Sequence, residues 1–469
     1  MIGIKEAAEV FKILREGRRY RDYEKFGAWY AGDTERMRLY SKRSAFWRRG
    51  KCGHKLHVPL AAELAAASAN FLFGEEPSVF AEDVSAQKRL DEALSACGFA
   101  AALYSCAELA SAYGDAYLKI NWDKALLDSP AVAHVPADCV YMEEVCGVPA
   151  AYHFLASEET PGGGRLWTYE LYGRGFIKTE IYEGSPESLG RLAGEATAAT
   201  GVDAPLAAHF PNVLPDPADP AGVFGRSDLF GLTDMLDALD EAYSSWVRDM
   251  SLAKARLIVP MEYMRIKQSA FGNDDRKIYH FDRDDDLYVA MDIDTSEASS
   301  PITLSQFAIR SEEHAKLCRE LIERIVSAAG YSPQSFGLEV SGWAESGAAL
   351  AIRERKTFAT KAKKELCFKA RLRRFISLFM RADEAVFGHK YRSFGASVEI
   401  KGNSAYLSGI AATVEALSRA GAASTYTKVQ IAHPDWSDAA ILEEVEKIKA
   451  EKIFAKGESG NGLGLELGL

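Results

Sequence analysis

The chain has 469 residues, a net charge of −11 and 48% hydrophobic residues, which is enough material for about two to four structural units. The acidic balance excludes a protein whose whole surface binds nucleic acid. Seven irregularly spaced cysteines without a CxxC pair predict reduced thiols and not a disulfide framework. Residues 1–20 predict an amphipathic helix in place of a signal peptide, and no apolar run approaches the ~20 residues that cross a bilayer.

The N-terminal half predicts helices followed by an antiparallel sheet. An alanine-rich apolar helix is expected over 57–73, where Gly74 and Pro77 end it, and a second helical stretch over 85–113. Alternation predicts a strand over 116–122, and short alternating runs separated by glycines predict hairpins over 131–185. Residues 184–222, rich in Gly, Ala, Pro and Asp, are expected to form a loop with one short strand near His209.

The C-terminal half is dominated by long helices. Ser227 is expected to cap the first of them, which Pro260 forbids from continuing. Gly330 and Pro333 end the second, and short strands and polar turns are expected between the two. The expected elements are helices over 227–256, 308–329, 348–387, 408–420 and 437–455, a strand over 397–400, and a disordered glycine-rich tail over 457–469.

No motif that carries catalysis is present: the sequence has no P-loop, no GxSxG elbow and no HExxH. Cys52, His54 and His57 could ligate zinc, but a fourth ligand is missing nearby and the flanks are basic, so a loop before a helix is preferred. The acidic run 282–286 lacks the glycine and distal glutamate of an EF-hand loop, which favours a solvated turn. We expect no enzyme activity, no cofactor and no metal.

The long helix after residue 348 is unusually basic. It carries eleven Lys or Arg residues between Ala348 and Arg381, opposed by Glu354 and Glu365, so the remainder of the chain is near −20. Either nucleic acid or the acidic surface of a neighbouring subunit could pair with it. The spread of these residues around the helix favours the neighbouring subunit slightly. The candidate contacts are Arg353, Arg355, Lys361, Lys364, Arg371 and Arg374.

Two long helices flank a polar insert, and each is apolar along one stripe and therefore needs a partner. In a monomer these helices would be exposed hairpins, whereas in a ring each would pack against a neighbour's copy. The stripes of the two helices hold Leu232, Leu239, Trp246, Leu317, Leu321 and Ile325.

Several segments, taken in order, resemble the portal proteins of tailed bacteriophages, the siphophage type in particular. PLAAELAAASANFLFGEEP (59–77) resembles an early family helix, YGDAYLKINWD (113–123) a family strand, and HVPADCVYMEE (134–144) the strand and turn after it. The best match is the segment GRSDLFGLTDMLDALDEAYSSWVRDMSLAKARLIVP (225–260), and SPQSFGLEVSGWAESGAALAIRERKT (332–357) resembles the stretch before the family's long wing helix.

The resemblance implies an α+β portal fold with long stem and wing helices, an α/β wing, a small β-containing clip and a helical crown. It implies a dodecameric ring that conducts double-stranded DNA at one capsid vertex of a virion assembled in the bacterial cytoplasm. The expected partners are the terminase large subunit, a head–tail adaptor, and the capsid and scaffold proteins, with no membrane. The implied regions are the wing (1–227 with 348–403), stem helices (228–257 and 308–330), clip (258–307), tunnel-loop region (331–347), crown (404–456) and tail (457–469).

Two regions of this implied fold carry further candidate residues. The tunnel loop facing DNA would hold Glu339, Val340, Ser341, Gly342, Trp343, Ala344 and Glu345, and the clip contact would hold Tyr279, Phe281, Asp284, Asp285 and Asp286. Glycines let such a loop move, and its apolar tip would slide past phosphates without trapping them. The alternative function is another oligomeric head–tail adaptor or scaffold, which would share the ring packing; a nuclease or terminase subunit would need motifs that the chain lacks.

Overall fold

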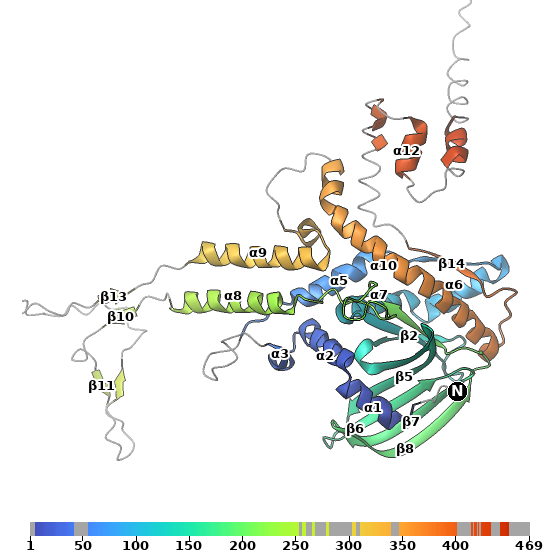
Figure 1. Cartoon of the computed structure of the whole chain (residues 1–469), viewed down its shortest axis with the longest axis horizontal. Helices are drawn as coiled ribbons and strands as arrows, with labels where there is room; N and C mark the ends of the chain where they lie inside the picture. The colour runs from blue at the N-terminus through green and yellow to red at the C-terminus, as the bar shows by residue number, and fades with distance from the viewer. Residues whose placement is uncertain are drawn as a thin grey trace, which may run out of the picture. The chain divides into compact units, whose positions relative to one another are not determined.

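The structure is a computed structural model with a mixed helix and sheet fold of the α+β class (Figure 1). It describes residues 5–41, 55–252, 256–258, 265–267, 278–280, 303–305, 310–338, 347–400, 414–415, 417–419, 421, 424–432 and 441–449. The chain divides into two compact units. Unit 1 comprises 1–43, 59–237 and 322–469, and unit 2 comprises 44–58 and 238–321.

Unit 1 begins with three helices, α1 (Ala7–Glu16), α2 (Arg18–Ala31) and α3 (Thr34–Tyr40). The carboxylate of Asp33 caps α3 by accepting from the backbone N–H of Glu35 and Arg36 at 3.1 and 3.0 Å. Gly32 adopts a left-handed conformation that closes α2. The expected N-terminal amphipathic helix is therefore present, although it breaks after residue 16.

Alanine-rich helices form the central helical layer of unit 1. They are α5 (Leu60–Phe73), α6 (Gln87–Ala96) and α7 (Phe99–Tyr113), and α5 packs against α7. Their small side chains allow close approach of the helices. Gly114 follows α7 at φ +103°, and a Cβ there would lie 2.7 Å from the carbonyl oxygen of Gly225. This position therefore requires glycine. The predicted helices over 57–73 and 85–113 are confirmed.

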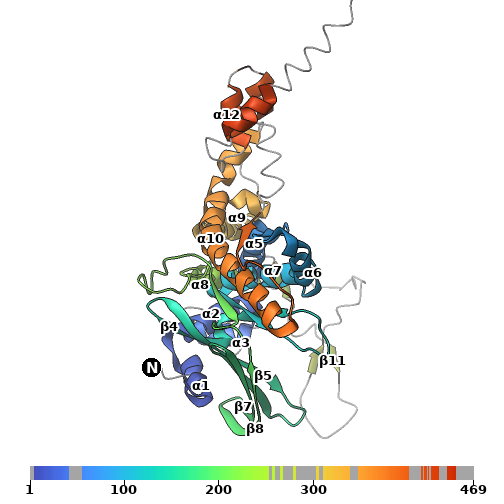
Figure 2. The ribbon, with the colours of Figure 1, turned by 90° about the vertical axis from the view of Figure 1, so that its right-hand side faces the viewer.

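Two antiparallel sheets carry most of the β structure of unit 1 (Figures 1 and 2). One sheet has the order β3-β2-β9, with β2 (Asp115–Asn121), β3 (Ala131–Pro136) and β9 (Ala207–Pro211). The other has five strands joined in sequence order, β4 (Val140–Val145), β5 (Val148–Glu159), β6 (Arg165–Tyr172), β7 (Phe176–Ser185) and β8 (Ser188–Ala199). The predicted hairpins are confirmed.

The expected loop over 184–222 is wrong in its first part, because β8 is a strand that pairs along β7. Its sequence, SLGRLAGEATAA, has few large apolar residues, and it is exposed along almost its whole length. An edge strand without a buried face shows no hydrophobic alternation, so pattern analysis misses it. The short strand expected near His209 is confirmed as β9.

The two long helices of the C-terminal half are α8 (Thr233–Leu252) and α9 (Ser311–Ala329), and the boundary between the units falls within both. Ser227 does not cap α8. Its hydroxyl accepts from the N–H of Leu229 in a turn, and the helix begins only after Gly231 at φ +75°. Short strands lie between the helices, as expected: β10 (Arg256–Ile258) pairs with β13 (Thr303–Ser305), and β11 (Arg265–Lys267) pairs with β12 (Ile278–His280).

The last described elements follow residue 347. Helix α10 (Gly347–Ala382) continues into a single π-helical turn over Asp383–Phe387, and β14 (Ala396–Glu399) pairs with β1 (Ser78–Ala81). Phe368, Leu372 and Phe375 of α10 are fully buried in the core of unit 1. Helix α10 contacts β9 and α5, and the two helices lie close together in Figure 2. The predicted long helix and strand are confirmed.

A short helix, α12 (Thr425–Ala432), was not expected, whereas the helical residues 441–449 lie inside the helix expected over 437–455. Val429 and Val445 form a small apolar cluster with Ile441. In the described part of the chain, no single helix is long and apolar enough to cross a membrane; Val84–Ala96 and Phe99–Tyr113 would suffice only together, and they are bent by 62°.

Candidate functional site

Two of the predicted sites lie largely outside the described residues. All seven tunnel-loop candidates, 339–345, fall there, and so do Phe281 and Asp284–Asp286 of the clip. Tyr279 lies in β12, opposite Ile266 of β11. The assignment of these residues to a DNA-facing loop and to a clip contact therefore stays a prediction.

Only one of the three candidate metal ligands lies among the described residues. Cys52 and His54 lie outside the described residues, and His57 is engaged within unit 2, where its Nδ1 lies 2.9 Å from the Asp240 carboxylate. The same carboxylate accepts the backbone N–H of Val58 at 2.9 Å. Within the described ranges, no three His, Cys, Asp or Glu residues are grouped to hold a metal ion.

The α8/α9 pair of unit 2 is held together by polar and aromatic contacts. Asp249 of α8 accepts from Arg310 at 2.8 Å and lies 2.9 Å from Nε2 of His314 in α9. The hydrogen bond from His314, followed by that from Arg310, lowers the pKa of Asp249. Trp246 stacks on His314 with ring centroids 6.3 Å apart and planes at 7°. The two helices therefore run side by side and are joined near the end that carries the insert.

The predicted apolar stripe of these helices is only partly covered. Leu239 is fully buried, and Leu321 and Trp246 are half-buried. By contrast, Leu317 of α9 is 48% exposed and Met250 of α8 is 52% exposed. Unit 2 therefore presents large apolar side chains that the described residues do not cover. The two remaining predicted positions, Leu232 and Ile325, lie in unit 1 and are buried.

A buried ion pair joins distant segments of unit 1. The Lys364 ammonium of α10 contacts the carboxylate of Asp228, and their side chains are 1% and 6% exposed. Lys364 also donates to the hydroxyl oxygen of Ser68 in α5 at 2.6 Å and to that of Tyr331 at 2.8 Å. Asp228 precedes α8 and Tyr331 follows α9, so this cluster fastens to α10 both the chain that enters the helix pair and the chain that leaves it.

The Asp228 carboxylate is saturated with donors besides Lys364. Ser111 donates to it at 2.6 Å, Tyr331 at 2.8 Å and Asn212 at 2.9 Å. Burial lowers the pKa of Lys364, and burial together with the adjacent carboxylate raises that of Tyr331. Sequence analysis missed this cluster. Helical periodicity could have predicted the burial of Lys364, because Lys361, Lys364 and Phe368 follow one another at helical spacing on the buried stripe of α10.

The basic residues of α10 divide into two groups. Lys361 and Lys364 are buried, Arg371 is half-buried, and Lys361 lies 3.6 Å from Glu365. Lys369 is half-buried as well, 3.8 Å from Glu365. The described basic residues therefore lie on both sides of the helix, and those that are exposed gather on its solvent-exposed face. That face carries Arg355, Lys356, Lys363, Arg373, Arg374 and Arg381. The side chain of Arg353 is not among those that the structure describes.

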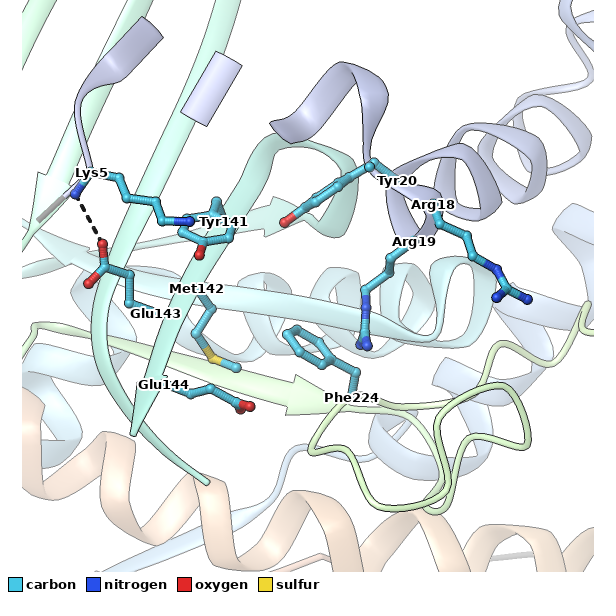
Figure 3. A pocket seen from close by; sticks show the side chains of 10 residues that line it. Lys5, Arg18, Arg19, Tyr20, Tyr141, Met142, Glu143, Glu144 and Phe224 are labelled. Carbon is cyan, nitrogen blue, oxygen red and sulfur yellow. Dashed lines mark hydrogen bonds between the residues drawn. The ribbon is translucent and has the colours of Figure 1, made fainter. Parts of the chain in front are cut away.

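A pocket of about 400 Å³ lies between the N-terminal helices and β4 (Figure 3). Arg19 forms part of its wall, where it stacks on Phe224 at 3.5 Å and pairs with Asp219 at 2.8 Å. On the opposite side, Glu143 accepts the Lys5 backbone N–H at 3.2 Å and lies 3.0 Å from Nε2 of His153. These contacts bind the N-terminal helices to the sheet, and Nη1 of Arg19 is buried without a hydrogen-bond partner among the described residues.

The histidine behind this pocket is the centre of a second buried polar cluster. His153 is fully buried, and its Nδ1 lies 2.7 Å from the hydroxyl oxygen of Tyr169. Burial lowers the pKa of His153, which opposes the effect of the neighbouring Glu143. The Tyr169 hydroxyl lies 3.2 Å from the Lys5 carbonyl oxygen. The cluster therefore anchors the start of the described chain and is structural in character.

Comparison with known proteins gives solved structures only, since no family model and no curated protein matches the chain. The chain is similar to one in the neck of an empty GTA particle computed with C6 symmetry: 13% identity, 82% of this chain, 92% of that chain, TM-score 0.43. It is also similar to a chain of the virion of the native gene transfer agent (GTA) particle, with 12% identity over 80% of this chain and 89% of that chain and a TM-score of 0.40. A chain in the neck of the native GTA particle computed with C12 symmetry is 14% identical over 79% of this chain and 88% of that chain, with a TM-score of 0.39.

Proposed function

We propose that the chain is a portal-type subunit: one copy of a closed ring that conducts duplex DNA at the head–tail junction of a tailed phage or phage-like particle. The order of the portal-like sequence segments supports this proposal. The structural observation that carries it is the exposure of large apolar side chains on the α8/α9 pair, which no described residue covers.

The exposed apolar side chains of unit 2 are available to a partner. Leu317 and Met250 are each about half exposed, on helices that are joined to each other chiefly through Asp249 and Trp246. Full burial of such a side chain contributes about 1.5–3 kcal/mol, so covering the exposed half of each contributes about half as much. A ring of identical chains offers every copy the same neighbour and leaves no uncovered end.

In this proposal the chain has no chemistry of its own. A separate ATPase, the terminase large subunit, moves the DNA and docks on the insert between α8 and α9, and an adaptor later occupies the same end. The ring belongs to the particle, contacts capsid and scaffold proteins, and is made in the host cytoplasm. A dodecamer is the expected ring size. A preparation free of terminase that hydrolyses ATP or cleaves DNA would contradict the proposal.

A second candidate is a different oligomeric adaptor or scaffold of the head–tail junction, which would use the same apolar helix faces. The portal and the adaptor differ in whether they form a DNA channel of their own and support packaging. A portal ring has a central channel wide enough for a duplex and supports packaging, whereas an adaptor assembles on a ring that already exists.

Assembly tests the proposal directly. Native mass measurement and negative-stain images of the full chain are expected to give closed rings with a central channel. Leu317→Gln with Met250→Gln is expected to shift the protein toward monomers while leaving its circular dichroism unchanged. The matched control is Leu126→Gln, a surface leucine 79% exposed in unit 1, which should assemble normally. A wild-type chain that stays monomeric at micromolar concentration would overturn the proposal.

A further inference from the structure

All charged residues on the solvent-exposed face of α10 are cations. Over residues 354–382, the exposed positions hold six cations, three alanines and one leucine, with no carboxylate among them. The two glutamates of this stretch, Glu354 and Glu365, are half-buried beside the core-facing stripe. Glu365 is already engaged, because Lys361 and Lys369 lie 3.6 and 3.8 Å from its oxygens.

Three of these six exposed cations have no ion-pair or hydrogen-bond partner within the described part of the chain. Arg355, Lys363 and Arg373 make no ion pair or hydrogen bond with described residues. The remaining contacts are peripheral: Lys356 donates to the Ser327 carbonyl oxygen, and Arg381 lies over the ring of Phe394 at 4.9 Å. In a chain of net charge −11, α10 therefore carries a group of cations that the described residues do not neutralise.

The dimensions of this face suit a duplex. Residues 355–381 span about 39 Å at a helical rise of ~1.5 Å, a little more than the ~34 Å of one turn of B-DNA. Four of the six cations are arginines, whose planar forks match phosphate oxygens. The phosphate backbone of DNA is a continuous polyanion and needs no apolar anchor.

The composition of the face argues against a protein partner. Cores of protein–protein interfaces are apolar and aromatic and are depleted in charged residues. Here the only large apolar side chain among the exposed positions 354–382 is Leu366, and alanines separate the cations. The face therefore offers charge with little surface to desolvate.

We propose that the exposed face of α10 is a sequence-independent binding surface for the phosphate backbone of duplex DNA, contributed by Arg355, Lys363, Arg373 and their exposed neighbours. The inference rests on the proposed function, which supplies duplex DNA as the polyanion the ring handles. It goes beyond that function because it assigns DNA binding to a helix and not to a loop lining the conduit.

The test measures affinity of the full chain for a random-sequence duplex of about three helical turns as salt rises. The variant is Lys363→Gln with Arg373→Gln. The control, Lys124→Gln with Arg174→Gln, removes the same charge from two exposed unit 1 positions outside α10. Each lost phosphate contact makes the slope of log affinity against log salt concentration shallower by about 0.9. Between about 50 and 200 mM salt, the wild type should therefore lose about tenfold more affinity than the variant, and the control should match the wild type.

Native mass measurement of the same samples separates the outcomes. An unchanged slope in the α10 variant, or a wild type that does not bind the duplex, would overturn the inference and leave the ring untouched. A variant that fails to assemble while the control assembles would also overturn it, because the face would then be a contact between copies of this chain. If the wild type forms no ring but the slope still falls only in the α10 variant, the proposed function fails and the inference stands.

Discussion

Replacing Lys364 with methionine should destabilise unit 1 strongly. The change removes the ammonium group and keeps most of the side-chain volume, so it leaves the Asp228 carboxylate charged and buried. Loss of one member of a buried ion pair costs about 3–5 kcal/mol. Ser111, Tyr331 and Asn212 still donate to the carboxylate. The expected loss in the free energy of unfolding is therefore at the lower end of that range, about 3 kcal/mol.

The neighbouring lysine supplies the control. Lys363→Met alters an exposed side chain one residue away, and its effect on the free energy of unfolding should stay within about 0.5 kcal/mol. Urea unfolding followed by circular dichroism measures both variants. Hydrogen exchange locates the effect, which should appear in peptides around residues 68, 228 and 331.

A double-mutant cycle isolates the ion pair from the rest of the cluster. Asp228→Asn with Lys364→Met replaces both charges. The double variant should therefore lose less free energy of unfolding than the sum of the two single variants, by at least about 1 kcal/mol. Equal stability of Lys364→Met and Lys363→Met, or strictly additive single changes, would show that the buried pair does not hold these segments together.

Three further predictions follow from other features. Gly114→Ala forces a side chain into a left-handed backbone that is also crowded, so it should cost about 2 kcal/mol or more, whereas Gly98→Ala at φ +64° with open space around it should cost about 1 kcal/mol, both by urea unfolding. The lowered pKa of His153 means that the unfolded chain binds more protons below about pH 6.5, so the melting temperature should fall as pH drops through that range. His153→Gln should flatten this dependence, whereas His134→Gln, an exposed control, should keep it. Trp343→Ala in the predicted tunnel loop should leave rings intact in micrographs while reducing DNA packaging or retention; loss of assembly would assign that residue to the core.

The elements that sequence patterns predicted well have at least one buried face. Helices α5, α7 and α9 repeat apolar residues at helical spacing, strands β2 and β9 are buried on both faces, and glycine or proline marks most of the ends of these elements. Pattern analysis failed where that face is missing. Strand β8 is exposed almost throughout, and Ser227, a good capping residue, forms a turn before α8 because Gly231 delays the helix.

The candidate sites were harder to predict than the fold. The charge density of α10 is visible in the sequence, but its separation into buried and exposed groups depends on which stripe packs in the core. Burial of Phe368 and Phe375 fixes that stripe, places Lys364 inside and turns Arg373 outward. Asp228 could not be paired with Lys364 from local spacing, because 136 residues separate them.

Unit 1 is assembled from three separate stretches of chain, and this sets an order on its biosynthesis. The core around Phe210 and Phe99 is completed by Phe368 and Phe375, which leave the ribosome long after the strands they cover. Until α10 emerges, the nascent chain exposes the apolar surface of α5 and β9 and carries Asp228 without its cation. A chain terminated anywhere before residue 364 should therefore be a target for chaperones and proteases instead of a partly working subunit.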